Sequence, residues 1–273
     1  MLAILATHPI QYQVPIWQQL AERGTVPFEV WYLTAHGVKP SLDRQFGTVF
    51  SWDMDMLGGY PHRFPPEPVP QQLGGFWEVG LPGDFRDWLN SRRITALLVH
   101  GWNVRACWEA IYLAHRAGVK VWMRGDSNDL KLDTGAKRLV KRWLLGSLLR
   151  RVDGFLCVGE ANRRLYRHYG VGEERLFSGP HCVDNRRFAA QARQYAPDRQ
   201  ALRRAWGFPI TLTVCCLSAN SSLKSIPSIS LPPHTGWLRS TQTGRITCSS
   251  SEPANWETSC ADGAEWFMTP SLA

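Results

Sequence analysis

The chain has 273 residues and a formal net charge of +8 at neutral pH. No stretch reaches the ~20 consecutive apolar residues of a transmembrane helix, and Met1 leads directly into an apolar run rather than a charged leader, so we expect a cytoplasmic protein. The basic balance favours anionic partners, namely phosphates, nucleic acid or an acidic membrane leaflet.

Apolar strands and amphipathic helices alternate from the first residues onward. The pattern predicts strands at residues 2–6, 28–33, 48–52, 96–100, 119–123, 154–158 and 176–178. It predicts helices at residues 15–21, 84–93, 104–117, 136–152 and 161–169, with another helix after the turn at residues 178–184. This alternation indicates an α/β fold of the Rossmann-like kind, a mostly parallel sheet with helices on both faces. Ligands of such sheets bind at the carboxyl ends of the strands.

The composition changes near Pro209. The last 64 residues contain 20 Ser or Thr, four of the seven Cys and only three Lys or Arg. If the codons of this segment are read one base out of phase, they permit strings such as LLFVGKFIPKK and HLFVVGAGELG, which look like strands entering phosphate-facing loops. We therefore predict one domain at residues 1–209, followed at residues 210–273 by an out-of-frame tail. The alternative is a natural Ser/Thr-rich disordered segment.

The cysteines of residues 1–209 are Cys107, Cys157 and Cys182, which are too widely separated to match any pairing or metal-binding spacing. We expect no disulfide and no metal site. The loop after the first strand, Thr7 to Gln13, contains no glycine, so the dinucleotide-binding fingerprint is missing and a nicotinamide cofactor is not expected.

Polar and aromatic residues follow three of the predicted strands. His8 and Gln11 follow the first strand and can hydrogen-bond a hydroxylated ligand, although a polar loop that caps the next helix would look the same. His100 ends a later strand, where it can act as a polar clamp, a proton-transfer group or a cap of the following helix. Gly101 permits a tight turn after it, and Trp102 offers a flat face suited to a sugar ring.

Arg124 and Asp126 follow the next strand. An arginine at this position can bind an anion in bidentate fashion, and the alternative is an Arg–Asp salt bridge that shapes the loop. We predict His100 as the catalytic residue, and His8, Gln11, Gly101, Trp102, Arg124 and Asp126 as acceptor-binding residues.

The segments THPIQY, HGW, RGD, VGEANRRLY and YGVGEERLFSGPHCVDNRRF, in this order, resemble the amino-terminal half of GT-B glycosyltransferases of the large retaining group called family four. The last segment in that group usually reads V-P-N-G-V-D-x-x-x-F. Here His181 and Cys182 stand in place of Asn-Gly, while Val183, Asp184 and Phe188 keep their spacing. The resemblance covers residues 1–209, and it assigns His181, Val183, Asp184 and Phe188 to the domain linker.

The resemblance implies transfer of a sugar from a nucleotide-sugar substrate to a glycan or lipid-linked acceptor, with retained stereochemistry and no metal or cofactor. It implies that the acceptor binds the amino-terminal domain and that His100 is the cleft histidine beside the reacting carbon. The groups that hold the diphosphate belong to the carboxyl-terminal domain, which we expect this chain to lack, so the chain alone should be inactive. The alternative is a non-enzymatic α/β module that binds a glycan or an anionic surface.

The helix predicted at residues 136–152 is basic and amphipathic. Its cations are Lys137, Arg138, Lys141, Arg142, Arg150 and Arg151, and its apolar residues include Trp143 and several leucines. Such a helix can lie on an anionic leaflet as a peripheral contact at the inner membrane face, or it can pack its leucines on the sheet and leave its charges in solvent. We expect no nucleic acid as partner, because the cations cluster on one helix and no nucleic-acid-binding motif accompanies them.

Overall fold

The computed structural model describes residues 1–38, 40–43, 48–50, 52, 54–66, 75–129 and 135–205. The chain divides into two units, Met1–Ala192 and Arg193–Ala273. The predicted tail at residues 210–273 lies outside the described residues, so its reading frame and structure stay predictions. In the second unit the described residues hold the end of α6 (Asn185–Tyr195) and the short helix α7 (Arg199–Ala205).

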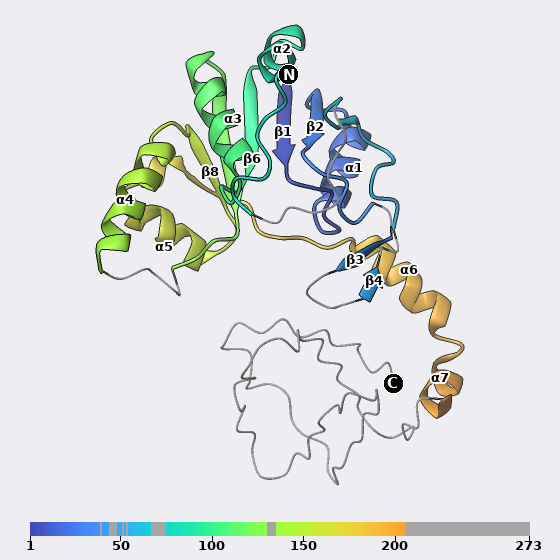
Figure 1. Cartoon of the computed structure of the whole chain (residues 1–273). Helices are drawn as coiled ribbons and strands as arrows, with labels where there is room; N and C mark the ends of the chain where they lie inside the picture. The colour runs from blue at the N-terminus through green and yellow to red at the C-terminus, as the bar shows by residue number, and fades with distance from the viewer. Residues whose placement is uncertain are drawn as a thin grey trace. The chain divides into compact units, whose positions relative to one another are not determined.

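The first unit is built on one seven-stranded sheet whose neighbouring strands are all parallel. The strand order is β5-β2-β1-β6-β7-β8-β9. In sequence these strands are β1 (Leu2–Ala6), β2 (Phe28–Tyr32), β5 (His62–Arg63), β6 (Ala96–His100), β7 (Lys120–Gly125), β8 (Gly154–Cys157) and β9 (Leu176–Ser178). A separate antiparallel hairpin joins β3 (Ser41–Asp43) to β4 (Thr48–Phe50). The predicted α/β parallel-sheet fold is confirmed (Figure 1).

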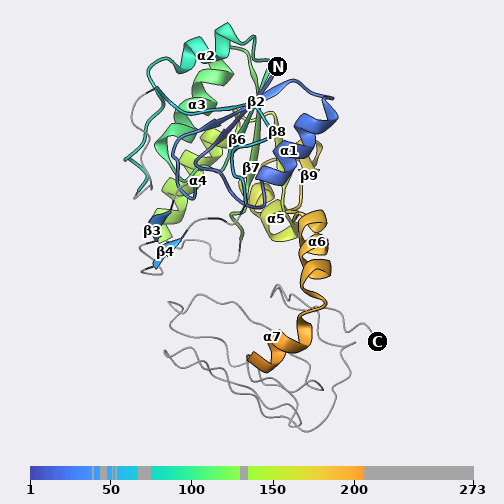
Figure 2. The ribbon, with the colours of Figure 1, turned by 90° about the vertical axis from the view of Figure 1, so that its right-hand side faces the viewer.

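Helices cover both faces of the sheet (Figure 2). They are α1 (Val14–Arg23), α2 (Phe85–Ser91), α3 (Arg105–Arg116), α4 (Gly135–Leu149) and α5 (Glu160–His168), with a 3-10 turn at Glu173–Arg175. Buried residues of α1 pack on one face, and buried residues of α2, α3, α4 and α5 pack on the other. Because side chains alternate along a strand, each central strand serves both cores.

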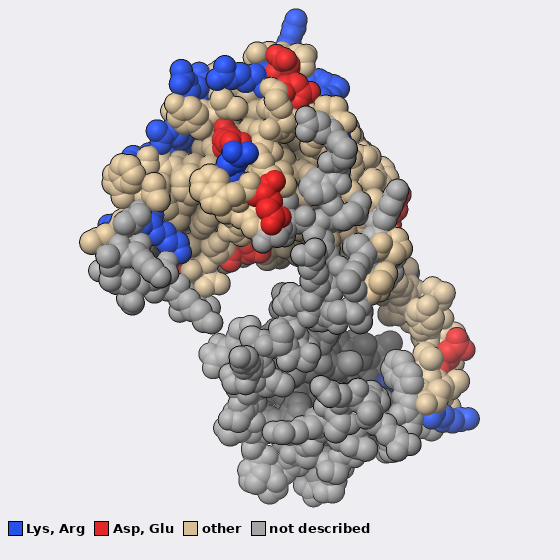
Figure 3. All heavy atoms as spheres, in the orientation of Figure 1, with Lys and Arg blue, Asp and Glu red and all other residues tan. Residues whose placement is uncertain are grey.

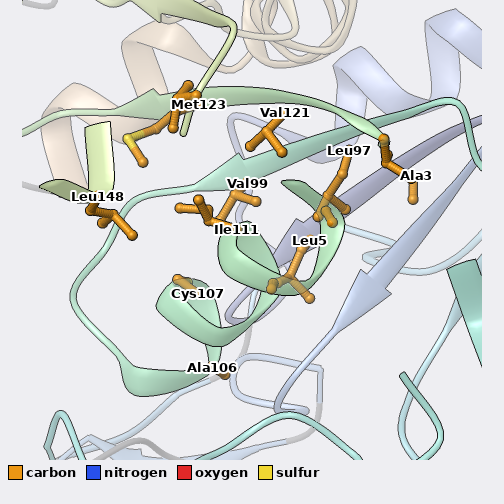
Figure 4. Packing of buried hydrophobic residues seen from close by; sticks show 14 of the residues in the cluster. Ala3, Leu5, Leu97, Val99, Ala106, Cys107, Ile111, Val121, Met123 and Leu148 are labelled. Atoms are coloured by element: carbon orange, nitrogen blue, oxygen red, sulfur yellow. The ribbon is translucent and has the colours of Figure 1, made fainter. Parts of the chain in front are cut away.

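Strand β6 shows this division. Leu97 and Val99 are fully buried against α3, where Cys107 and Ile111 face them (Figure 4). Leu98, between them, belongs to the core under α1. Burying a side chain of this size is worth about 1.5–3 kcal/mol relative to exposure, so the packing specifies which residues of the strand face which core.

Several predicted boundaries differ from the structure by one or two residues, and one helix end and one strand differ more. The helix predicted to end at residue 152 ends at Leu149, because Arg175 donates a 2.7 Å hydrogen bond from Nη2 to the Leu149 carbonyl and a second one to the Val152 carbonyl as the chain turns toward β8. Strand β5 was not predicted, since two residues are too few to show a period.

Candidate functional site

The order in which the chain adds strands to the sheet reverses between β1 and β6. From β1 the chain continues outward to β2, whereas β6 leads in the opposite direction to β7, β8 and β9. In open parallel sheets the loops that leave this point diverge and form a crevice at the carboxyl ends of the strands, which is where ligands bind. The loop of Thr7 to Gln13 and the turn of His100 to Trp102 both leave the sheet at this point.

His100 and Gln13 form a buried polar pair at this point. The Nε2 atom of Gln13 lies 3.0 Å from Nδ1 of His100, and the indole of Trp17 meets the imidazole edge-on with ring centroids 5.7 Å apart. Two atoms of the pair, Oε1 of Gln13 and Nε2 of His100, are buried without a hydrogen-bond partner among the described residues. Buried polar atoms are nearly always paired, so these two unpartnered atoms point to a group that the protein binds.

Burial, followed by the nearby charges of Arg124 and His181, lowers the pKa of His100 to about 3. The imidazole is therefore neutral at pH 7. With the Gln13 amide donating to Nδ1, the ring proton sits on Nε2. The pair thus offers one donor, the Nε2–H of His100, and one acceptor, the Oε1 of Gln13. Of the roles considered for His100, this geometry favours the polar clamp over proton transfer near neutral pH.

The loop after β1 places its two predicted residues differently. His8 is partly buried, accepts or donates a 2.9 Å hydrogen bond with the Thr7 hydroxyl, and meets His36 edge-on at 5.1 Å between ring centroids. Burial, followed by the effect of His36, lowers the pKa of His8 to about 4. Gln11 is exposed, whereas Gln13, which we did not single out, is 5% exposed and contacts His100.

Arg124 is buried, and it holds the chain that follows β9. Its Nε donates to the Gly179 carbonyl at 3.2 Å, and its Nη2 donates to the Pro180 carbonyl at 3.0 Å and lies 3.4 Å from His181 Nδ1. Asp126 is exposed, and no Arg124–Asp126 ion pair within 4.0 Å is found between these two described residues. The Arg124 guanidinium therefore connects β7 to the segment that follows β9. It does not form the alternative salt bridge with Asp126.

The turn after β6 is tight, as its sequence predicts. Gly101 has φ +80°, in the left-handed region that favours glycine, and its N–H donates to the Arg124 carbonyl at 2.7 Å. Trp102 then packs against the core under α3 to α5, with its ring edge-on to Tyr166 at 6.1 Å. One side of the Trp102 residue lines a pocket of about 160 Å³.

The predicted linker residues begin helix α6. The Asp184 carboxylate accepts a 3.0 Å hydrogen bond from the Arg187 backbone N–H, which is the N-cap to N3 contact that stabilises a helix start. His181 meets Tyr12 edge-on at 4.8 Å, and Val183 and Phe188 are exposed. Asp184 therefore has a local structural role as the N-cap of α6. The assignment of His181, Val183, Asp184 and Phe188 to a domain linker stays a prediction.

No group of three His, Cys, Asp or Glu side chains in the described part of the chain is arranged to hold a metal ion. Among the same residues, no helix is long and apolar enough to cross a membrane.

The fold is that of an α/β protein, with a candidate site at the carboxyl ends of its parallel strands. The glycosyl transferase 4-like domain family matches residues 13–177, which is more than half of the chain, so the chain belongs to this family and the resemblance seen in the sequence is confirmed. No curated protein matches the chain.

Among solved structures, the UDP-GlcNAc 2-epimerase from Neisseria meningitidis, bound to UDP-GlcNAc, aligns with 14% sequence identity and a TM-score of 0.43. The alignment covers 76% of this chain and 53% of the epimerase chain. The chain thus spans about half the length of that protein.

Proposed function

We propose that residues 1–209 form the acceptor-side domain of a retaining glycosyltransferase, which transfers a sugar from a nucleotide-sugar donor to a hydroxyl of a glycan or lipid-linked acceptor. The observation that carries this proposal is the pair of His100 and Gln13, with its buried unpartnered donor and acceptor at the point where the sheet changes direction. A sugar ring carries several hydroxyls that both donate and accept, so two hydroxyls of one ring can satisfy the two atoms. Membership of the glycosyl transferase 4-like family supports the same reading.

In this proposal the two side chains act on the reacting sugar by hydrogen bonding. The Nε2–H of His100 donates to a hydroxyl whose oxygen gains negative character as the transition state forms, and Gln13 fixes the imidazole tautomer through Nδ1. Preorganised donors of this kind contribute strongly, because a buried donor that is already in position needs no rearrangement during the reaction. Gly101 has no side chain that would fill the space beside this pair. His8 follows the neighbouring strand β1.

We propose that this chain lacks the donor-binding domain because the codons that follow about Pro209 are out of frame. The experiment is to restore the frame there and to assay both proteins with a panel of nucleotide sugars and glycan acceptors. We expect transfer by the frame-restored protein and none by the 273-residue chain. Acceptor binding by both proteins without transfer by either would favour the alternative, a non-enzymatic glycan-binding module.

Helix α4 supports a peripheral contact with an anionic membrane on the cytoplasmic side. Leu139 and Trp143 lie one helical turn apart and are 64% and 70% exposed, and Leu144 is also exposed. The exposed Lys141, Arg142 and Arg150 flank them, and α4 contains no acidic residue. Lys and Arg side chains lie over this region at the left of the molecule in Figure 3. An exposed apolar ridge between cations is typical of a helix that lies in the headgroup layer.

We predict that the chain sediments with vesicles containing an anionic phospholipid and not with vesicles of neutral phosphatidylcholine. Trp143→Ser should weaken the binding at least about tenfold, because full burial of a large apolar side chain is worth more than 1.4 kcal/mol. Trp77→Ser is the matched control, since Trp77 is 75% exposed but lies outside α4. Equal loss in both variants, or equal binding to neutral vesicles, would contradict the assignment to α4.

A further inference from the structure

A pocket lies beside the strand edge, between the turns that follow β6 and β7 and the helices α4 and α5. Its volume is about 160 Å³. Trp102 comes from the first turn and Ser127 from the second. Lys141 and Leu145 come from α4, Leu165 comes from α5, and Tyr169 is the C-cap of α5. None of these residues belongs to the pair of Gln13 and His100.

The pocket has a rigid aromatic wall. The Trp102 ring packs edge-on against Tyr166, which is fully buried, and the Trp102 carbonyl accepts a 2.8 Å hydrogen bond from Trp108 Nε1. The first contact holds the Trp102 ring, and the second holds the Trp102 backbone. A flat apolar surface that is held in place before binding loses little entropy when a ring stacks on it.

The polar rim of the pocket is equally fixed. Asn162 is 2% exposed, its Nδ2 donates to the Ser127 carbonyl at 2.6 Å, and its Oδ1 accepts from the Val158 N–H at 3.2 Å. A buried amide with both ends bonded sets the position of the Ser127 turn. The neighbouring Asp129 accepts two hydrogen bonds from Arg164, at 2.7 and 3.1 Å, which anchors the same turn to α5.

Size and lining together indicate the kind of ligand. A cavity of about 150 Å³ holds a six-membered ring such as benzene. The residues that line this pocket of about 160 Å³ are two aromatic residues, two leucines, two asparagines, one serine and one lysine. A sugar ring has apolar faces and a polar edge, so it matches this mixture better than a purely apolar ring. Lys141 favours a ring that carries an anionic substituent.

The pocket and the His100 pair lie at the same edge of the sheet, on its two sides. His100 packs toward Trp17 of α1, whereas Trp102 packs with the core under α3 to α5. The turns that follow β6 and β7 lie close together between the pocket and the His100 pair. A Cβ atom built on Gly125 would be only 3.6 Å from the Cα atom of Gly101. A ligand with two linked rings can cross this edge over the two glycines.

We propose that the pocket beside Trp102 binds a second, non-reacting sugar ring of the acceptor, one that carries a phosphate or carboxylate group. This proposal rests on the proposed function, since it takes the Gln13–His100 pair as the place of the reaction. The pocket then determines which acceptor is used, and the polar pair acts on the reacting ring.

The test uses the full chain labelled with 5-fluorotryptophan. The ¹⁹F signal of Trp102 is assigned by its loss in Trp102→Phe and followed during titration with methyl hexosides, hexose 6-phosphates and inorganic phosphate. We expect a hexose phosphate to shift this signal saturably with a dissociation constant on the order of 1 mM, since one ring makes few contacts. The methyl hexoside should bind more weakly, inorganic phosphate should leave the signal in place, and the Trp77 signal should not move.

Two variants and one control separate the outcomes. Ser127→Leu puts a larger side chain into the pocket while keeping the carbonyl that Asn162 binds, and it should weaken binding at least about tenfold. Lys141→Gln, on an exposed position, should remove the preference for the phosphorylated sugar and decides the case if Ser127→Leu fails to fold. His100→Ala should leave the titration unchanged, so a failed transferase proposal and a failed pocket proposal remain distinguishable. No shift of Trp102 with any hexose, or an equal shift with phosphate alone, would overturn the proposal.

Discussion

His100→Ala in the frame-restored protein is expected to lower turnover on the order of a hundredfold. The variant removes the Nε2–H donor from a buried site, and removal of one preorganised donor to the transition state usually costs 10²–10³ in turnover. The loss should appear in kcat at saturating acceptor, because the hydrogen bond strengthens as charge develops. Steady-state kinetics of the purified variant, together with its thermal unfolding, give both readouts.

The control for this experiment comes from the preceding residue of β6. The Val99 side chain is fully buried on the opposite side of the same strand, away from the polar pair. Val99→Ala should therefore lower the melting temperature and leave turnover near normal. If His100→Ala behaves like Val99→Ala, with reduced stability and near-normal turnover, His100 is a structural residue and the site assignment is wrong.

Acid is expected to destabilise the fold through His100 in particular. Its pKa is about 3 in the folded chain and 6.5 when unperturbed, so between these values the unfolded state binds the proton and the folded state does not. Stability is then unaffected by this group above about pH 6.5 and decreases as the pH falls toward 3. At about 1.4 kcal/mol per pH unit, the loss between pH 6.5 and pH 4.5 is on the order of 2–3 kcal/mol.

Urea unfolding at neutral pH and near pH 4.5 measures this loss. His100→Gln keeps a polar side chain beside Gln13 but cannot take up the proton, so it should be less sensitive to acid than the unmodified chain by about that amount. His115→Gln, at an exposed position of α3, is the control and should keep the original sensitivity. His8, with its pKa lowered to about 4, adds to the loss in both proteins and cancels in the comparison. An unchanged pH dependence in His100→Gln would show that His100 is accessible to water.

The sequence allowed the sheet to be predicted because its strands are short, apolar and separated by helices. Strands β1 and β6 have the predicted bounds, Leu2–Ala6 and Ala96–His100, since each is a compact apolar run that ends at a polar residue. The same reasoning predicted a site at the carboxyl ends of the strands, with His100 in it. A strand of two residues, such as β5, lacks the repeat that makes prediction possible.

The partners within the site were less predictable. Gln11 and Gln13 stand in the same loop, and only the start of α1 at Val14 determines that Gln13 points inward to His100. Arg124 was expected to meet a ligand or Asp126, but its acceptors are carbonyls 55 and 56 residues further along the chain. Contacts of this range depend on how the elements pack and leave no local pattern in the sequence.

The register of β6 beside β1 has a consequence for how this domain tolerates insertions and deletions. Leu2 pairs with Ala96 and Leu5 with Val99, and the strand start is fixed by the Thr95 N–H donating to the Met1 carbonyl at 3.0 Å. Adding or removing one residue within β6 would turn every later side chain to the other face. Removing one residue would turn His100 toward the apolar core under α3 and place Gly101 beside Gln13. Adding one residue before Val99 would place Val99 beside Gln13. We expect homologous chains to vary freely in the identity of the core residues of β6 but to keep the number of residues between its start and the histidine.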